Sequence, residues 1–259
     1  MRIGYYGNSI GDHFGVANIF LEGKAPGLFI GYRTQGVVQE GDVVDGKIRF
    51  QKEDGTEGFY TSQYSTKVGD LKFVDLNGDG EINDKDRTII GDPNPGFIYG
   101  FSTNLKYKNF ALAAAFTGVQ GRDILNTNNR YLSTPAINNG MLLKKAFQGR
   151  WTAENPNNLY PANTFVVNNY ILDRYVEDAS YLRCSDITLS YNFEEAWMKA
   201  IKFRSASVFF SVKNAFIITN YSGYDPEVNS FAFDGLRPGI DMRSYPNARS
   251  FVFGLNIGF

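Results

Sequence analysis

Five stretches of alternating sequence constrain the fold of this 259-residue chain more than any other feature. They span residues 97–107, 110–119, 181–193, 203–217 and 248–259. In the first stretch, one set of alternate positions is mainly large and apolar and the other is mainly small or polar: Phe97, Tyr99, Phe101, Leu105 and Tyr107 against Gly100, Ser102, Asn104 and Lys106. Because successive side chains of a β-strand point to opposite faces, this period of two predicts strands with one apolar face.

The connections between these strands alternate in length. Residues 107–109 and 194–202 make short links, whereas 120–180 and 218–247 are long and polar. Transmembrane β-barrels have short periplasmic turns and long extracellular loops. A soluble antiparallel sandwich also alternates, but it rarely carries such long irregular connections. We therefore predict an all-β fold in which these are antiparallel strands of a large transmembrane β-barrel with long extracellular loops.

The sequence changes character near residue 96. Residues 1–26 are predicted to be loop, residues 28–39 a short interrupted strand, and residues 48–50 and 58–60 a small hairpin. If Phe259 is periplasmic, the loops 120–180 and 218–247 and the region before Phe97 are extracellular. The prediction is an extracellular region with short strands over 1–96 and five barrel strands with their loops over 97–259.

The segment Asp75–Asp86 has the spacing of a calcium loop. Oxygen-bearing side chains occupy loop positions 1, 3, 5, 9 and 12, glycine occupies position 6, and position 7 offers a backbone carbonyl. A hard cation requires this many oxygen ligands. The residues predicted to hold Ca²⁺ are Asp75, Asn77, Asp79, Glu81 and Asp86, and Asn83 reaches the ion through a water.

This segment need not be a calcium sensor: it could be a metal-free turn or a structural calcium site. Asp, Asn and Gly also form turns without any metal. A sensor needs a helix on each side of the loop, but the residues after Asp86 are β-branched and soon reach Gly91 and Pro93. We therefore predict that the segment is a structural calcium clip. The alternative function for the chain is a calcium-stabilised extracellular binding or interaction module, of which a dockerin is one example.

Composition excludes several classes of function. The net charge of −1 indicates no nucleic-acid partner. Cys184 is the single cysteine, so no internal disulfide or cysteine-based zinc site is possible, and His13, the single histidine, is predicted to lie in a solvated loop. Asp173, Glu177 and Asp178 lie close in sequence, but no nucleophile and base accompany them, so we predict no enzyme.

Aromatic residues in the long loops are candidates for contact with a ligand. Trp151, Tyr160, Tyr221 and Tyr224 can stack on sugars. Aromatic belts at a membrane interface explain many Tyr and Trp residues equally well. Both explanations remain open.

Several motifs together carry a family resemblance, from about Leu28 to the end of the chain. They are Gly31-Tyr32, Gly36-Val37, 69–80 continuing into 86–91, Pro93-Asn94-Pro95, 174–183, Asn214-Ala215-Phe216, 224–227 and 244–249. The chain resembles the SusC/RagA family of TonB-linked outer-membrane transporters from Bacteroidota. Several motifs in family order are more specific than any one of them.

The resemblance implies a plugged 22-stranded barrel in the bacterial outer membrane that imports glycans or peptides. Its implied partners are a SusD-like surface lipoprotein, the TonB complex acting through an N-terminal part, the remaining barrel strands and outer-membrane lipid. The aromatic end resembles the signal read by the membrane-assembly machinery: Phe251, Phe253, Leu255, Ile257 and Phe259. Five strands cannot close a barrel, so the chain is expected to be a C-terminal portion without the plug domain, either a fragment or one piece of a split barrel.

Overall fold

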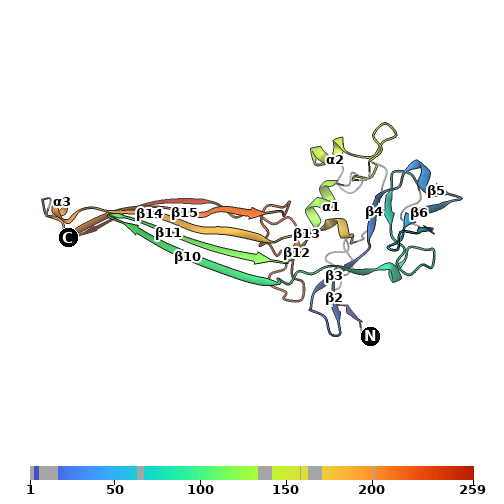
Figure 1. Cartoon of the computed structure of the whole chain (residues 1–259), viewed down its shortest axis with the longest axis horizontal. Coiled ribbons are helices and arrows are strands. Elements are labelled where there is room, and N and C mark those ends of the chain that lie inside the picture. The colour runs from blue at the N-terminus through green and yellow to red at the C-terminus, as the bar shows by residue number, and fades with distance from the viewer. Residues whose placement is uncertain are drawn as a thin grey trace. The chain divides into compact units, whose positions relative to one another are not determined.

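The chain forms two compact units in the computed structural model (Figure 1), which describes residues 3–5, 17–62, 67–133, 142–157, 159–162, 171–200 and 202–259. The first, here called the loop unit, comprises Met1–Asn94, Asp123–Glu177 and Val228–Ser244. The second, the sheet unit, comprises Pro95–Arg122, Asp178–Glu227 and Tyr245–Phe259. The helices of the described part are short, and none has the length and apolar character needed to span a membrane.

The sheet unit is built on one five-stranded antiparallel sheet (Figure 1). Its order is β10 (Phe97–Tyr107), β11 (Phe110–Gln120), β14 (Tyr181–Asn192), β15 (Ser205–Thr219) and β17 (Ser250–Gly258). A tight turn with Lys108 at φ 51° joins β10 to β11. The predicted link 194–202 contains a short helix, α3 (Glu195–Ala200), which the sequence prediction did not include. The five strands and their antiparallel pairing confirm the predicted fold class.

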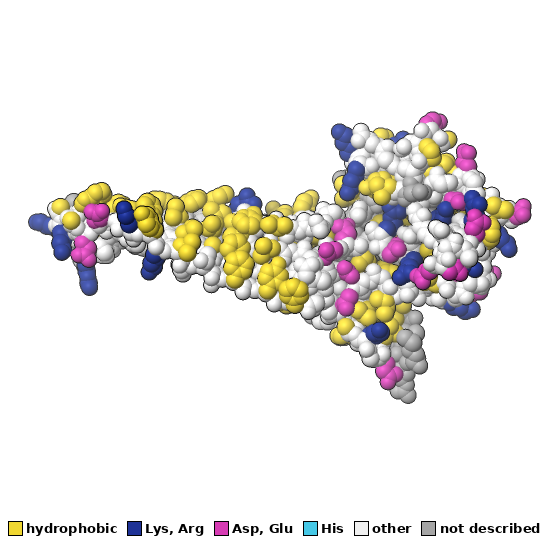
Figure 2. Space-filling view, viewed as in Figure 1, with side chains coloured by type: hydrophobic (Ala, Val, Ile, Leu, Met, Phe, Trp, Pro, Cys, Tyr) yellow, Lys and Arg dark blue, Asp and Glu magenta, His cyan; other side chains and the backbone are white. Residues whose placement is uncertain are grey.

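One face of this sheet is apolar and exposed. Cross-strand partners bring its aromatic side chains together, as in the stacked pairs Phe101–Phe116 and Phe210–Phe251. Phe101 is 55% exposed and Phe253 is 73% exposed. Figure 2 shows hydrophobic side chains gathered over this sheet. A soluble domain rarely exposes so continuous an apolar surface, and the lipid-facing side of a barrel wall does.

A β-bulge interrupts the alternation of β14. Phe116 pairs with Cys184 and Ala115 pairs with Asp186, so Ser185 has no partner in the ladder, and its hydroxyl donates to the carbonyl of Ala115 (3.1 Å). On β15 the same irregularity contains Asn214, at φ 52°. A bulge shifts the facing of the residues beyond it by one position. Simple alternation along the sequence cannot reveal this shift.

The loop unit contains several small sheets. They are a four-stranded sheet of β1 (Ile3–Tyr5), β2 (Asn18–Leu21), β3 (Leu28–Gly31) and β9 (Thr88–Gly91), a pair of β4 (Thr34–Val37) and β8 (Leu71–Phe73), a three-stranded sheet of β5 (Val43–Val44), β6 (Lys47–Gln51) and β7 (Glu57–Tyr60), and a sheet of β13 (Val176–Asp178), β12 (Asp123–Asn126) and β16 (Ile240–Asp241). Its helices are α1 (Thr127–Ser133) and α2 (Lys144–Gln148), with 3₁₀ turns at Glu40–Asp42, Asp84–Asp86 and Asp173–Tyr175. The predicted hairpin is confirmed as β6 and β7, since Ile48 pairs with Tyr60.

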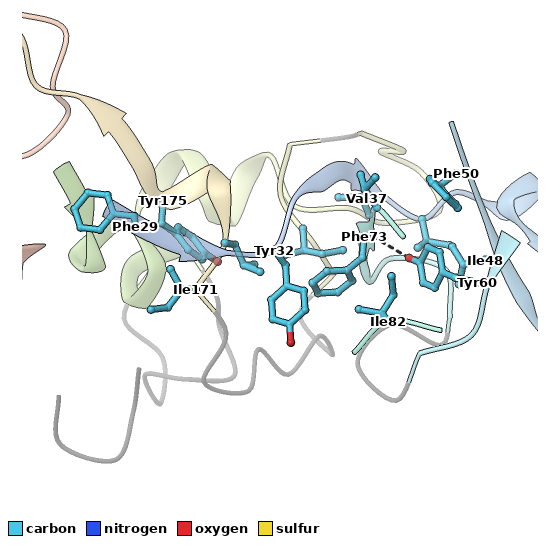
Figure 3. Packing of buried hydrophobic residues seen from close by; sticks show 14 of the residues in the cluster. Phe29, Tyr32, Val37, Ile48, Phe50, Tyr60, Phe73, Ile82, Ile171 and Tyr175 are labelled. Carbon is cyan, nitrogen blue, oxygen red and sulfur yellow. Dashed lines mark hydrogen bonds between the residues drawn. The ribbon is translucent and has the colours of Figure 1, made fainter. Parts of the chain in front are cut away.

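Aromatic side chains form the core of the loop unit (Figure 3). Phe29 and Tyr60 are completely buried, and Phe73 is 1% exposed. The ring of Tyr32 meets that of Phe73 edge-on at 6.0 Å between centroids. The Tyr60 hydroxyl accepts the backbone N–H of Phe73 (2.9 Å), so the polar tip of this buried ring is satisfied.

The structure corrects the prediction for residues 1–26, and it assigns most of the two long connections to the loop unit. Residues 1–26 were predicted to be loop, but β1 and β2 lie there and pair antiparallel, with Ile3 opposite Leu21. The apolar run Ile19-Phe20-Leu21 is short and lies among glycines, so the strand forms through its partners rather than through a visible period. Residues 123–177 and 228–244 of the two long connections pack within the loop unit. His13 and its predicted solvated loop lie outside the described residues.

Candidate functional site

The predicted calcium loop is a series of turns held by its own side chains. The carboxylate of Asp75 accepts the backbone N–H groups of Gly78 (2.7 Å) and Gly80 (2.8 Å). Asp86 is completely buried and accepts the N–H groups of Leu76 (2.9 Å) and Asn83 (2.8 Å). Gly78 and Gly80 have φ values of 75° and 82°, which glycine adopts without strain. Strand β8 precedes the loop, a 3₁₀ turn at Asp84–Asp86 ends it, and strand β9 follows it, as expected from the β-branched residues after Asp86.

Asp79 is the most exposed of the predicted carboxylate ligands in the first half of this loop. A hydrogen bond from the Glu81 N–H (3.0 Å) lowers its pKa, and the side-chain amides of Asn77 and Asn83 and the ammonium of Lys85 lower it further. The Glu81 N–H donates to Oδ1 of Asp79, whereas Asp79 Oδ2 accepts the Asn77 side-chain amide (3.0 Å) and lies 3.8 Å from Lys85 Nζ. Positive and partly positive groups therefore surround the Asp79 carboxylate, to which a cation would bind.

The donor set fits calcium only when amide and backbone oxygens are included. Among the described residues, no three His, Cys, Asp or Glu side chains are grouped to hold a metal. Carboxylate oxygens that accept one amide keep further lone pairs for a cation. A cavity of about 350 Å³ lies against the first half of the loop, and its lining includes Asp75 and Asn77 together with Glu53 and Asp54. This acidic lining is compatible with a cation that carboxylate, amide and carbonyl oxygens share.

Two of the four predicted ligand aromatics belong to the loop unit. Trp151 donates its indole N–H to Gln39 Oε1 (3.1 Å) and packs over Gly69, so its ring already has a structural role. Tyr160 pairs its backbone with Trp151 through a 3.0 Å hydrogen bond, and its side chain lines a separate cavity. The structure therefore brings Tyr160 to a cavity, whereas the Trp151 ring is engaged with Gln39 and Gly69.

The other two lie in the sheet unit. Tyr221 is buried, and its ring packs over Gly223. Tyr224 is 75% exposed. Only Tyr224 of this pair presents its ring to solvent and is free to stack on a ligand.

The cavity beside Tyr160 was not foreseen from the sequence. It encloses about 230 Å³ and is lined by residues from separate segments of the loop unit: Thr34, Gly36, Asn129, Ser133, Leu159, Tyr160, Arg174 and Tyr175. Nothing in their spacing brings them together, because four distant stretches of sequence meet only in the folded unit. Arg174 lies within a motif of the sequence, but its role as part of a cavity wall has no sequence signal.

The three neighbouring carboxylates are each engaged by different groups. Asp173 accepts the N–H (3.1 Å) and hydroxyl (2.7 Å) of Thr34, and Glu177 accepts the side-chain amides of Asn126 (3.0 Å) and Asn129 (3.2 Å). Asp178 accepts the hydroxyl of Ser180 (2.5 Å). These contacts hold chain segments in place and do not form an acid and base pair around a shared point.

Three sequence motifs of the sheet unit meet in one buried polar cluster. Arg183 donates to Asp225 (2.7 Å) and contacts Glu227 (3.0 Å), while Tyr181 donates to Glu227 and Asn247 donates to Asp225 (2.5 Å). Arg183 is 6% exposed and Asp225 is 3% exposed. Buried charges of opposite sign must be paired and hydrogen-bonded to be tolerated. This cluster ties β14 to two segments of the long connection between β15 and β17, at Asp225–Glu227 and at Asn247.

The residues of the predicted assembly signal lie on β17 and at the chain end. Phe251, Phe253, Leu255 and Ile257 share the exposed apolar face, and Phe259 is 90% exposed and meets Phe203 edge-on at 5.5 Å. β17 is an edge strand of the sheet, next to β15. Their exposure is compatible with recognition by another protein or with contact to lipid.

The comparisons with known proteins agree with one another, although no family model matches the chain. The sequence is 35% identical to the TonB-dependent receptor P3 of Formosa agariphila over 245 residues, which are 93% of this chain and 23% of that receptor. It is 32% identical over 192 residues to the TonB-dependent receptor SusC of Bacteroides thetaiotaomicron, covering 72% of this chain and 17% of SusC. The structure matches that of the RagAB peptide importer in its open-open state with a TM-score of 0.68 at 20% identity, over 100% of this chain and 24% of that chain. The chain thus spans about a quarter or less of the length of each of these proteins.

Proposed function

Because the chain belongs to the SusC/RagA family of TonB-dependent receptors, we propose that it forms part of an outer-membrane importer of glycans or peptides. The observation that carries this proposal is the sheet of the sheet unit, with its continuous exposed apolar face. A barrel wall presents such a face to lipid, and its edge strands pair with further strands. The sheet supplies the wall strands β10, β11, β14, β15 and β17, and the remaining strands of the barrel cover its two edges.

The aromatic residues near the turn end of the sheet support an orientation in the membrane. Phe110 and Tyr191 lie 4.8 Å apart between ring centroids, and Tyr191 meets Phe193 at 5.3 Å. Trp197 of α3 is 58% exposed, next to the exposed charges of Glu195 and Lys199. Aromatic girdles followed by charged residues are typical of the membrane–water interface. In this proposal the short turns face the periplasm and the loop unit is extracellular.

The proposal includes partners outside the chain. The relatives are receptors of the TonB-dependent class, so energy for import reaches the whole receptor from the TonB complex. The curated relatives include SusC and the matched structure is that of the RagAB peptide importer, and this likeness supports a SusD-like lipoprotein as the surface partner of this receptor. No catalytic role is assigned, since the neighbouring carboxylates Asp173, Glu177 and Asp178 each hold other groups.

Import is tested in cells from which the receptor gene has been deleted. We expect loss of growth on a particular glycan or peptide mixture, and restoration by the full-length receptor. A receptor carrying Phe253→Arg on the exposed face should reach the membrane in smaller amounts and restore growth only partly. Unchanged growth of the deletion strain on every such nutrient, or recovery of the receptor as a monodisperse water-soluble monomer, would contradict the proposal.

We also propose that Asp75–Asp86 is a structural calcium clip in the extracellular loop unit. The buried carboxylates of Asp75 and Asp86 hold the turns by accepting backbone amides, and a cation would neutralise the negative charge that gathers there. The clip orders the loop against β7, since Thr61 and Glu81 form a bridge between the two segments. Its role is to hold shape, because no helix pair flanks it.

Limited proteolysis of the receptor with calcium or with chelator tests the clip. We expect cleavage within 75–86 to increase in chelator, and the double variant Asp75→Ala with Asp79→Ala to be cleaved in both conditions while the strands stay protected. Asp178→Ala is the matched control, because Asp178 accepts the Ser180 N–H in a similar turn (2.8 Å) outside both the loop and the cavity beside it. Equal cleavage of the wild-type loop in calcium and in chelator contradicts the clip.

The alternative function, a calcium-stabilised extracellular binding module, is favoured by one observation: the loop unit has its own buried aromatic core. It predicts that the loop unit binds a ligand when no transport takes place. Retained binding by a receptor that cannot import would support it.

A further inference from the structure

The cavity beside Tyr160 has a distinctive charge balance. Of the residues that line it, Arg174 alone is formally charged at neutral pH. The two nearest acids in sequence do not line the cavity, but they accept hydrogen bonds from two residues that do: Asp173 from Thr34 (2.7 Å) and Glu177 from Asn129 (3.2 Å). Among the described residues, the Arg174 guanidinium is therefore the charged group in the cavity wall itself, and the two carboxylates behind the wall are engaged by neutral donors.

The remaining lining residues include hydroxyl and amide side chains and two aromatic rings, together with Gly36 and Leu159. Ser133 is 4% exposed and Tyr175 is 2% exposed, while Tyr160 and Arg174 are half-buried. The Arg174 guanidinium donates to the carbonyl of Leu159 and lies 5.8 Å from the centre of the Tyr175 ring. Because a guanidinium has five N–H donors, this contact orients the fork and leaves donors for an anion.

The geometry points to a carboxylate-binding subsite in this cavity, with Arg174 as the anion-binding residue and Tyr160 as its aromatic wall. An arginine fork matches a carboxylate in two parallel hydrogen bonds. At about 230 Å³ the cavity is smaller than a pocket for a whole ligand, so it accepts one terminal group of a larger chain. This inference rests on the proposed import function and narrows its cargo to acidic chains.

Two sources supply this chemistry, namely the C-terminal carboxylate of a peptide and the carboxylate of a uronic acid in a glycan. The experiment uses the full-length receptor in detergent and four probes: N-acetyl-alanyl-alanine, its C-terminal amide, glucuronic acid and glucose. Saturation-transfer NMR measures their affinities. We expect one or both acids to bind about tenfold or more tightly than the matched neutral probe, as charged hydrogen bonds contribute.

Two variants locate the interaction. Arg174→Gln should remove the preference for the acid, and Arg174→Lys should weaken it, because an ammonium keeps the charge but loses the fork. Arg150→Gln is the matched control, since Arg150 also donates to a backbone carbonyl, that of Phe147, and lies 4.2 Å from its ring centre, but does not line the cavity. It should retain the full preference.

The comparison of acid with neutral probe needs no variant, so it decides the matter even if Arg174→Gln disturbs folding. Equal binding of acid and neutral probes by the wild-type receptor overturns the subsite. An acid preference that survives Arg174→Gln, or that Arg150→Gln removes equally, also overturns it. Cellular uptake is measured separately: acid-selective binding without import contradicts the import function alone, and import without acid selectivity contradicts the subsite alone.

Discussion

The two units use the same residue types in opposite ways. The loop unit hides its aromatics, with Phe29 and Tyr60 completely buried. The sheet unit exposes them, with Phe101 at 55% and Phe253 at 73%. A high aromatic content therefore does not specify one environment: the first unit has its own apolar core, whereas the second needs an apolar medium outside it.

Two ion pairs, one from each unit, show the reverse order. In the sheet unit the Arg183 and Asp225 side chains are 8% and 4% exposed, whereas the Arg237 and Asp234 side chains of the loop unit are 20% and 15% exposed. Both pairs join at 2.7 Å. The same chemistry thus occurs at two depths, and desolvation decides what each pair contributes. The following predictions test this contrast.

The largest expected effect is on the core of the loop unit. Phe73→Ala should destabilise that unit by about 3–5 kcal/mol, because it leaves a cavity among rings that are already packed. Phe101→Ala, which removes the same ring from an exposed position, should have a small effect on the receptor in detergent. Hydrogen exchange of the two units measures both variants, and equal losses would remove the contrast between them.

The buried ion cluster should respond nearly as strongly. Arg183→Met leaves Asp225 without its cation in a buried site, which costs about 3–5 kcal/mol. The double variant Arg183→Met with Asp225→Leu should recover much of this loss, since no isolated charge remains. Exchange of the amides at 224–227 is the measurement, and a single variant as stable as the wild type would show that water reaches the cluster.

An arginine substituted on the exposed apolar face tests whether lipid or water contacts that face. Phe253→Arg should destabilise the receptor in a bilayer by about 2–4 kcal/mol if the position lies near the membrane midplane. Lys213→Arg on β15, which changes no charge, is the control. Unfolding in lipid vesicles measures both, and an unaffected Phe253→Arg receptor would contradict a lipid-facing role for this surface.

A single buried hydroxyl tests how closely the loop core is satisfied. Tyr60→Phe removes the acceptor of the Phe73 N–H, and an unsatisfied buried donor costs about 1–3 kcal/mol. The change keeps the ring, so loss of volume cannot explain the result. Faster exchange of the Phe73 amide is expected, and unchanged exchange would mean that another acceptor replaces the hydroxyl.

The contrast between the units also explains what the sequence could predict. The strand 97–107 was predicted with the bounds that the structure gives it, because its period of two is long and ends at a tight turn. The parallel pairing of Leu125 with Ile240 could not be predicted, since residues far apart in sequence determine it. The bulge at Ser185 was missed for a similar reason, as it depends on the partner strands.

Candidate site residues were harder to predict than strands. The loop Asp75–Asp86 has a spacing that can be recognised, and the structure forms compact turns there. Trp151 and Tyr221 were chosen as aromatic residues in loops, but one packs over Gly69 and the other is buried. Residue type does not reveal the direction of a side chain. Arg174 lines a cavity because distant segments of the chain fold together around it, and no local sequence pattern predicts that arrangement.

The smallest expected effect is on the partly buried ion pair of the loop unit, Arg237 with Asp234. A hydrogen bond from the Leu236 N–H and one from Arg237 lower the pKa of the Asp234 carboxyl. A lowered pKa in the folded state gives stability that is present above the unfolded value, about pH 4, and is lost as the pH falls through the folded value. Carboxyl NMR should show Asp234 titrating below the ordinary range. Arg237→Gln should raise the pKa only part of the way, because the Leu236 N–H remains, and molar salt should have a similar but smaller effect. If Arg237→Gln instead destabilised the loop unit as strongly as Arg183→Met affects the sheet unit, burial would not be what separates the two pairs.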